Sequence, residues 1–76
     1  MKKVLIIEDN KDIALQMKKY LTKDGYGVEI ASSFYEAEYK MNIDIDVALL
    51  DINLPDKGGH HLIERLKDKD IRVIVI

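Results

Sequence analysis

Residues 47–55 read VALLDINLP, in which four apolar side chains lead into Asp51 and Pro55 follows four residues later. An unbroken apolar run of this kind is typical of a strand that is buried on both faces of a parallel sheet. Residues 4–9 repeat the arrangement as VLIIED, with two acids directly after the apolar run. The two stretches therefore predict two central strands, each of which ends at acidic residues.

Amphipathic stretches alternate with apolar runs along the rest of the chain. The pattern predicts strands over residues 3–8, 26–31, 47–51 and 71–76, and helices over residues 11–23, 33–41 and 59–68. Strands that alternate with helices in this way are typical of an α/β fold. We expect an open, doubly wound parallel sheet with the order βαβαβαβ and with helices on both of its faces.

Local signals predict where two of the helices end or begin and which face of the first one is buried. Gly25 is expected to stop the first helix, because glycine is favoured just past a helix end. Ser33 and Glu36 have the spacing of a capping box at the start of the second helix. The first helix is expected to face the core through the stripe Met17, Tyr20 and Leu21.

The composition describes one soluble globular unit. Of the 76 residues, 47% are hydrophobic and 34% are charged, and no apolar run reaches membrane length. The net charge of −2 is not gathered into blocks, so binding of nucleic acid or membrane by this segment is not expected. The chain has no cysteine, and its start, MKKVLIIED, lacks a secretory signal. These features predict a cytoplasmic protein without disulfides.

Glu8, Asp9 and Asp51 follow the two predicted central strands, and the carboxyl ends of parallel strands meet at the same edge of a sheet. Two carboxylates about 5 Å apart repel each other by roughly 3 kcal/mol at an effective dielectric constant near 20. A hard divalent cation such as Mg²⁺ removes this conflict, since it prefers oxygen ligands. The cluster therefore predicts a magnesium site that serves phosphoryl transfer to a carboxylate.

With these residues in place, the chain resembles the receiver domain of bacterial two-component response regulators, the CheY-like, flavodoxin-like family. The resemblance rests on the pair Glu8-Asp9 after VLII, on VALLDINLP with Asp51 and Pro55, and on Gly59 four residues beyond the proline. It extends over residues 3–76. The family's domain normally has five strands and five helices, so we interpret residues 1–76 as a partial receiver domain that lacks the last strand and helices.

The resemblance implies a role for each residue of the predicted site. Asp51 is expected to accept a phosphoryl group from a sensor histidine kinase or a phosphotransfer protein, and the chain is not expected to be an enzyme. Asp9 and Asp51 are implied as ligands of Mg²⁺, Glu8 as an acid that acts on the ion largely through water, and Asn53 as a ligand through its backbone carbonyl.

The chain departs from the family pattern at two kinds of residue. One kind contacts the phosphoryl group, and the other caps a helix. The family has a serine or threonine hydroxyl after the fourth strand and a lysine at the end of the fifth, and the sequence reaches neither by Ile76. Gly58 stands where the family often has an aspartate as a helix cap. Glycine also caps helices tolerably, so we expect only a slightly weaker helix start.

Two alternatives accompany this interpretation. A magnesium-dependent phosphatase with an aspartyl nucleophile would want a second aspartate where the chain has Asn53. The chain could also be an interaction or dimerisation module that keeps the fold without the chemistry. In the receiver arrangement, the predicted fourth strand, residues 71–76, would be an exposed apolar edge, and we expect a homo-oligomer to form through it. His60 and His61 are expected to be surface residues, because no third metal ligand has suitable spacing.

Overall fold

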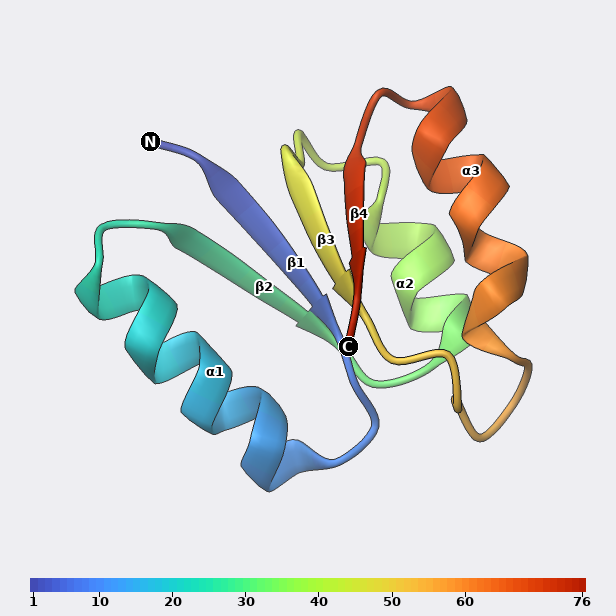
Figure 1. Ribbon diagram of the computed structural model, residues 1–76, viewed down its shortest axis with the longest axis horizontal. Helices are drawn as coiled ribbons and strands as arrows, with labels where there is room; N and C mark the ends of the chain where they lie inside the picture. The colour runs from blue at the N-terminus through green and yellow to red at the C-terminus, as the bar shows by residue number, and fades with distance from the viewer.

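The computed structural model describes residues 1–76 as a parallel sheet with helices on both sides (Figure 1). The strands are β1 (Lys3–Ile7), β2 (Gly27–Ala31), β3 (Val47–Leu50) and β4 (Arg72–Val75). The helices are α1 (Lys11–Lys23), α2 (Phe34–Lys40) and α3 (Ile63–Asp68), and a 3-10 turn, η1 (Gly59–Leu62), leads into α3. The sheet order is β2-β1-β3-β4, with every pair parallel. The predicted fold class is confirmed.

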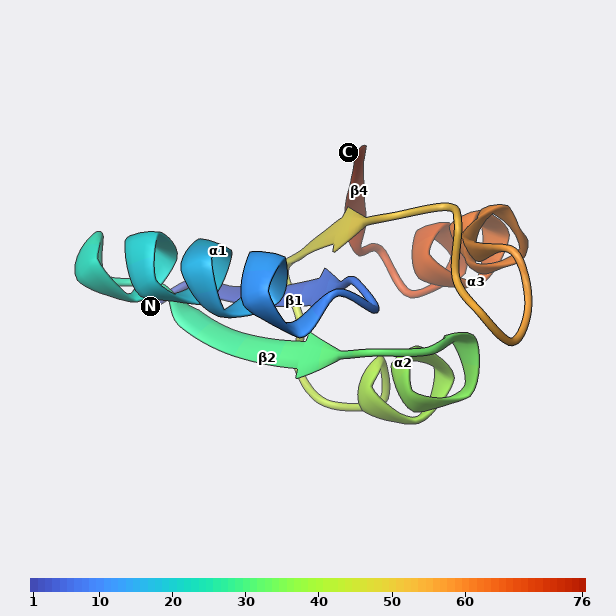
Figure 2. The same ribbon diagram turned by 90° about the horizontal axis from the view of Figure 1, so that it is seen from below.

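The two central strands bury side chains on both faces, as their unbroken apolar runs predict. Leu5 and Ile7 of β1 belong to the larger core cluster, which includes residues of α2 and α3, whereas Val4 and Ile6 pack toward α1. Figures 1 and 2 show α1 apart from α2 and α3, which lie near each other. Because β1 and β3 pair in parallel, their carboxyl ends lie at the same edge of the sheet. This edge lies between α1 on one face and α2 and α3 on the other.

Helix α1 begins and ends at the predicted residues. The side chain of Asn10 accepts hydrogen bonds from the backbone N–H groups of Asp12 and Ile13. At the other end, Gly25 has a φ of 94°, a conformation that costs glycine little. This turn lets the N–H of Tyr26 donate to the carbonyl of Leu21, which closes the helix.

The start of α2 confirms half of the predicted capping box. The Ser33 hydroxyl oxygen accepts a hydrogen bond from the N–H of Glu36 at 3.1 Å, as expected. The Glu36 carboxylate accepts from the N–H of Ser32 rather than from that of Ser33. The reciprocal bond has therefore moved one residue toward the N-terminus.

The prediction that Tyr20 belongs to the core is wrong, since 70% of this residue is exposed. Met17 and Leu21 are partly buried and pack against the small cluster formed with Ala14. Tyr20 lies about 100° around the helix axis from Leu21, which takes it outside the narrow stripe that meets the sheet. The predicted strands also extend one residue too far at one or both ends, and the first turn of the third predicted helix is 3-10.

Candidate functional site

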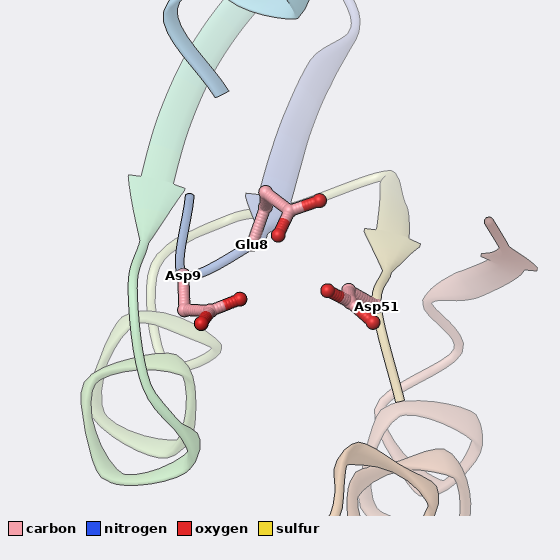
Figure 3. Close-up of side chains that lie close together, drawn as sticks. All are labelled: Glu8, Asp9 and Asp51. Atoms are coloured by element: carbon pink, nitrogen blue, oxygen red, sulfur yellow. The ribbon is translucent and has the colours of Figure 1, made fainter. Parts of the chain in front are cut away.

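The candidate site lies where β1 and β3 end side by side. The strands pair in parallel with Ile7 opposite Leu50, so the residues that follow them are brought together. Glu8, Asp9 and Asp51 each offer a carboxylate oxygen, and these three oxygens lie within 4.8 Å of one another. Figure 3 shows the three side chains around a common space. The structure thus brings together the three acids that the sequence places at strand ends.

Backbone hydrogen bonds continue the sheet ladder into the site. The N–H of Asp51 donates to the carbonyl of Ile7 at 2.9 Å, and the N–H of Glu8 donates to the carbonyl of Ala31 at 3.0 Å. Both acids are therefore held by the sheet itself. Their relative position depends on β-strand pairing and not on loop conformation alone.

Glu8 is the buried member of the cluster, with 7% of its surface exposed. Burial raises the pKa of its carboxyl above the ordinary value of 4.5, because the charged form loses hydration, and the nearby Asp51 raises it further. The N–H of Asn10 donates to the Glu8 carboxylate at 3.2 Å and opposes this rise. Negative charge on Glu8 is therefore costly in the absence of a cation.

Asn53 meets the cluster through its backbone. Its N–H donates to one carboxylate oxygen of Asp51 at 2.9 Å. Its carbonyl accepts no hydrogen bond from another residue, so it is free to act as an oxygen ligand. The three carboxylates of the cluster offer only oxygen ligands, the donor type that Mg²⁺ prefers.

Gly59 permits a close approach between the loop and the end of β3. A Cβ atom at this position would lie 2.6 Å from the carbonyl oxygen of Asp51 and 2.9 Å from the Cα atom of Ile52. The N–H of Gly59 donates to the carbonyl of Ile52 at 2.7 Å. The glycine in the sequence pattern thus has a steric reason, because any side chain would push the end of β3 away.

Gly58, which departs from the family pattern, lies beside the imidazole of His60. A Cβ atom at Gly58 would lie 2.7 Å from Cε1 and 2.8 Å from Nδ1 of His60. A side chain at position 58 would therefore require the exposed His60 ring to move. No side chain caps η1, so the cap expected to be weak is absent.

The two histidines lie together at the surface. The rings of His60 and His61 are 4.1 Å apart between centroids, and both residues are exposed. Desolvation, together with the charges of His60 and Lys57, lowers the pKa of His61 below 6.5. Neither histidine belongs to a group of three potential metal ligands.

Sequence reasoning missed Asp56, whose carboxylate binds a helix more than twenty residues away. One oxygen accepts from the N–H of Phe34 at 2.9 Å, and the other accepts from the N–H of Tyr35 at 3.3 Å. The hydrogen bond from Phe34, followed by that from Tyr35, lowers the pKa of Asp56 below 3.8. The turn PDKG around Asp56 gives no sign of this distant partner, since it would suit any exposed loop.

Comparison with known proteins places this geometry in a family. The family model described as "Response regulator receiver domain" matches residues 4–76. The chain belongs to this family. Receiver domains carry an acidic site of the kind formed by Glu8, Asp9 and Asp51.

The relatives include regulators and solved receiver structures. The transcriptional regulatory protein KdpE of Staphylococcus aureus is 45% identical over 97% of the chain, which spans 33% of that protein. A CheY-like receiver protein from Methanospirillum hungatei has a TM-score of 0.92 and 35% identity, with 99% of this chain and 62% of that chain covered. TrrA from Thermotoga maritima, in complex with Mg(2+)-BeF, has a TM-score of 0.89 and 28% identity, with 99% and 68% covered.

The receiver chain thus spans about one third of the length of the curated regulator it matches and about two thirds of the solved receivers. Its longest helix, α1, has 13 residues. No helix of the structure has the length and apolar character needed to cross a membrane.

Proposed function

We propose that the chain is a phosphoacceptor module of a two-component phosphorelay and that Asp51 accepts the phosphoryl group. The observation that carries the proposal is the carboxylate cluster: Asp51 lies within 4.8 Å of the ligand atoms of Glu8 and Asp9 in a chain of the receiver family. The proposed donor is a phosphohistidine of a sensor histidine kinase or of a phosphotransfer protein.

In the proposed step, a carboxylate oxygen of Asp51 attacks the phosphorus of the donor. The O–P bond forms as the P–N bond to the donor histidine breaks, and the released imidazole nitrogen takes up a proton. The hydrogen bond from the N–H of Asn53 orients the Asp51 carboxylate for this attack. The chain modifies itself, so we do not propose that it is an enzyme. The aspartyl phosphatase alternative lacks its second aspartate, where Asn53 stands.

We propose that Mg²⁺ binds at this site. Asp9, Asp51 and the carbonyl of Asn53 would hold the ion directly, and Glu8 would act on it largely through water. When bound, the ion supplies positive charge that neutralises the phosphoryl oxygens. Support comes from the all-oxygen donor set and from the Mg(2+)-BeF complex of TrrA, a relative of the same fold.

Labelling with acetyl phosphate in the presence of Mg²⁺ tests the proposal. Mass spectrometry of the intact chain should detect one added phosphoryl group, and peptide mapping should place it on Asp51. Asp51→Asn should abolish labelling, and Asp9→Ala should reduce both labelling and Mn²⁺ binding measured by water-proton relaxation. Asp44→Asn removes a carboxylate outside the cluster and is the matched control. Equal labelling of wild type and Asp51→Asn would refute the assignment.

A second candidate, an interaction or dimerisation module, is favoured by the exposed edge of β4. Ile74, Val75 and Ile76 are 48%, 52% and 52% exposed, and β4 pairs with β3 alone. We propose that residues 1–76, studied on their own, self-associate through this edge. We also propose that residues 1–76 are part of a receiver domain and that the protein is cytoplasmic.

A further inference from the structure

The loop between β3 and η1 is fastened at two points. Near η1, the N–H of Gly59 bonds to the carbonyl of Ile52, and the absence of a side chain lets the loop lie against the end of β3. In the middle of the loop, the carboxylate of Asp56 reaches the start of α2. Asn53, whose backbone belongs to the candidate metal site, lies between the strand end and Asp56.

The contact between Asp56 and α2 completes the cap of that helix. The first three N–H groups of a helix have no partners within it. The Ser33 hydroxyl takes the N–H of Glu36, and Asp56 takes those of Phe34 and Tyr35. Two side chains from distant parts of the chain therefore share one helix end. The bonds that Asp56 accepts are charge-assisted, which makes them stronger than neutral ones.

A second contact from the same loop reinforces the first. The Lys57 ammonium lies 4.8 Å from the centroid of the Phe34 ring, a distance suited to a cation–π interaction. Phe34 is buried in the main core cluster, so it is a fixed partner. Asp56 and Lys57 thus hold the loop to the backbone and to the side chain of the same residue.

We propose that Asp56 is a positioning residue for the phosphoacceptor site, because it holds the loop so that the Asn53 backbone stays directed at Asp51. This inference rests on the proposed function. Asp56 contacts neither the cluster nor a substrate, and it acts through the short segment that joins it to Asn53. Displacement of a positioned group by as little as about 1 Å can slow a reaction on the order of a hundredfold. The buried side chain of Leu54 also anchors the segment. We therefore expect removal of the Asp56 carboxylate to weaken Mn²⁺ binding and adduct formation by only about tenfold.

The test compares three variants with the wild-type chain under conditions in which circular dichroism shows each to be folded. Asp56→Ala removes both acceptors, and Asp56→Asn retains one acceptor oxygen. Ser33→Ala removes the other cap of the same helix without touching the loop. Mn²⁺ affinity is measured by water-proton relaxation, and formation of the beryllofluoride adduct is followed by fluorine NMR.

We expect Asp56→Ala to weaken Mn²⁺ binding and adduct formation by about tenfold, Asp56→Asn to weaken them less, and Ser33→Ala to leave both near wild type. Equal losses in Asp56→Ala and Ser33→Ala would overturn the inference, since they would trace the effect to the stability of α2. Wild-type affinity in Asp56→Ala would overturn it while leaving the proposed function intact. Failure of the wild-type chain itself to bind Mn²⁺ or beryllofluoride would reject the proposed function, and the positioning role with it. If Asp56→Ala does not fold, Asp56→Asn carries the comparison, and unchanged binding in that variant would count against the inference.

Discussion

Glu8 connects the chemistry of the candidate site to the stability of the fold. Its pKa is raised in the folded chain, so the stability linked to its protonation is present below the ordinary value of 4.5 and is lost as pH rises through the folded pKa. Ionisation of Glu8 therefore places a buried negative charge next to Asp51. The Mg²⁺ that we propose for this site would compensate this charge.

We expect Glu8→Gln to stabilise the metal-free chain at neutral pH and to reduce the additional stability that Mg²⁺ confers. Glutamine keeps the size of the side chain and removes the charge. Urea denaturation at about pH 4 and about pH 7, with and without Mg²⁺, checks both effects. The advantage of the variant should be small at the lower pH, because this pH lies below the raised pKa of Glu8 and the wild-type carboxyl is mostly protonated there. A variant that is less stable than wild type in metal-free buffer at neutral pH would contradict the role assigned to this charge.

Gly59 provides a second prediction at the scale of one residue. Gly59→Ala places a Cβ atom 2.6 Å from the carbonyl oxygen of Asp51, so the loop or the strand end must shift. We expect a loss of about 1–3 kcal/mol in the free energy of unfolding, together with weaker Mn²⁺ binding. Gly25→Ala is the control. It also strains the backbone, because Gly25 has a positive φ, but its added Cβ atom would meet no atom within 4 Å and would lie far from the cluster. If both variants retained wild-type Mn²⁺ affinity, the close approach at Gly59 would have no bearing on the site.

At the scale of single elements, helix α2 depends on a carboxylate that comes from another part of the chain. The pKa of Asp56 is lowered chiefly by the hydrogen bond from Phe34, so its contribution to stability is present above the ordinary value of 3.8 and is lost as pH falls through the folded pKa. The cationic groups of Lys57 and Arg65 lie 4.8 Å and 5.8 Å from the centroid of the Phe34 ring.

We therefore expect the amide proton resonances of Phe34 and Tyr35 to titrate together, with a midpoint below 3.8. Proton NMR over a pH series measures this midpoint directly. In Asp56→Asn the same resonances should show no such titration, which identifies the group responsible. A shared midpoint at or above the ordinary value would show that the two hydrogen bonds do not favour the charged carboxylate.

The elements also show what the sequence could and could not predict. The bounds of α1 followed from its periodicity and from Gly25, because both are local properties of the chain. The convergence of Glu8, Asp9 and Asp51 could be expected, because parallel strands share an edge. The exposure of Tyr20 depends on how narrow a stripe of α1 meets the sheet. The partner of Asp56 depends on where α2 begins relative to a loop far along the chain, and no short-range pattern carries that information.

At the scale of the whole molecule, the exposed face and edge of β4 should govern the behaviour of residues 1–76 in isolation. We expect size-exclusion chromatography with light scattering to report a dimer or larger species at micromolar concentration. Val75→Lys should shift the species toward monomer, because a charge on an edge strand opposes pairing. Tyr39→Lys changes another exposed residue, on α2, and should leave the assembly unchanged. A wild-type chain that is monomeric and melts independently of concentration would contradict this prediction.

The strands that bear the acids lie side by side in the sheet but are separated along the chain by α1, β2 and α2. A chain emerging from the ribosome therefore presents Glu8 and Asp9 long before Asp51 exists to face them. The ladder between β1 and β3 cannot form until β3 has been translated, and the contact of Asp56 with α2 cannot form until translation has passed Asp56. Capture of a cation by the nascent chain would thus mark the pairing of β1 with β3, because no locally folded part of the chain holds all three carboxylates.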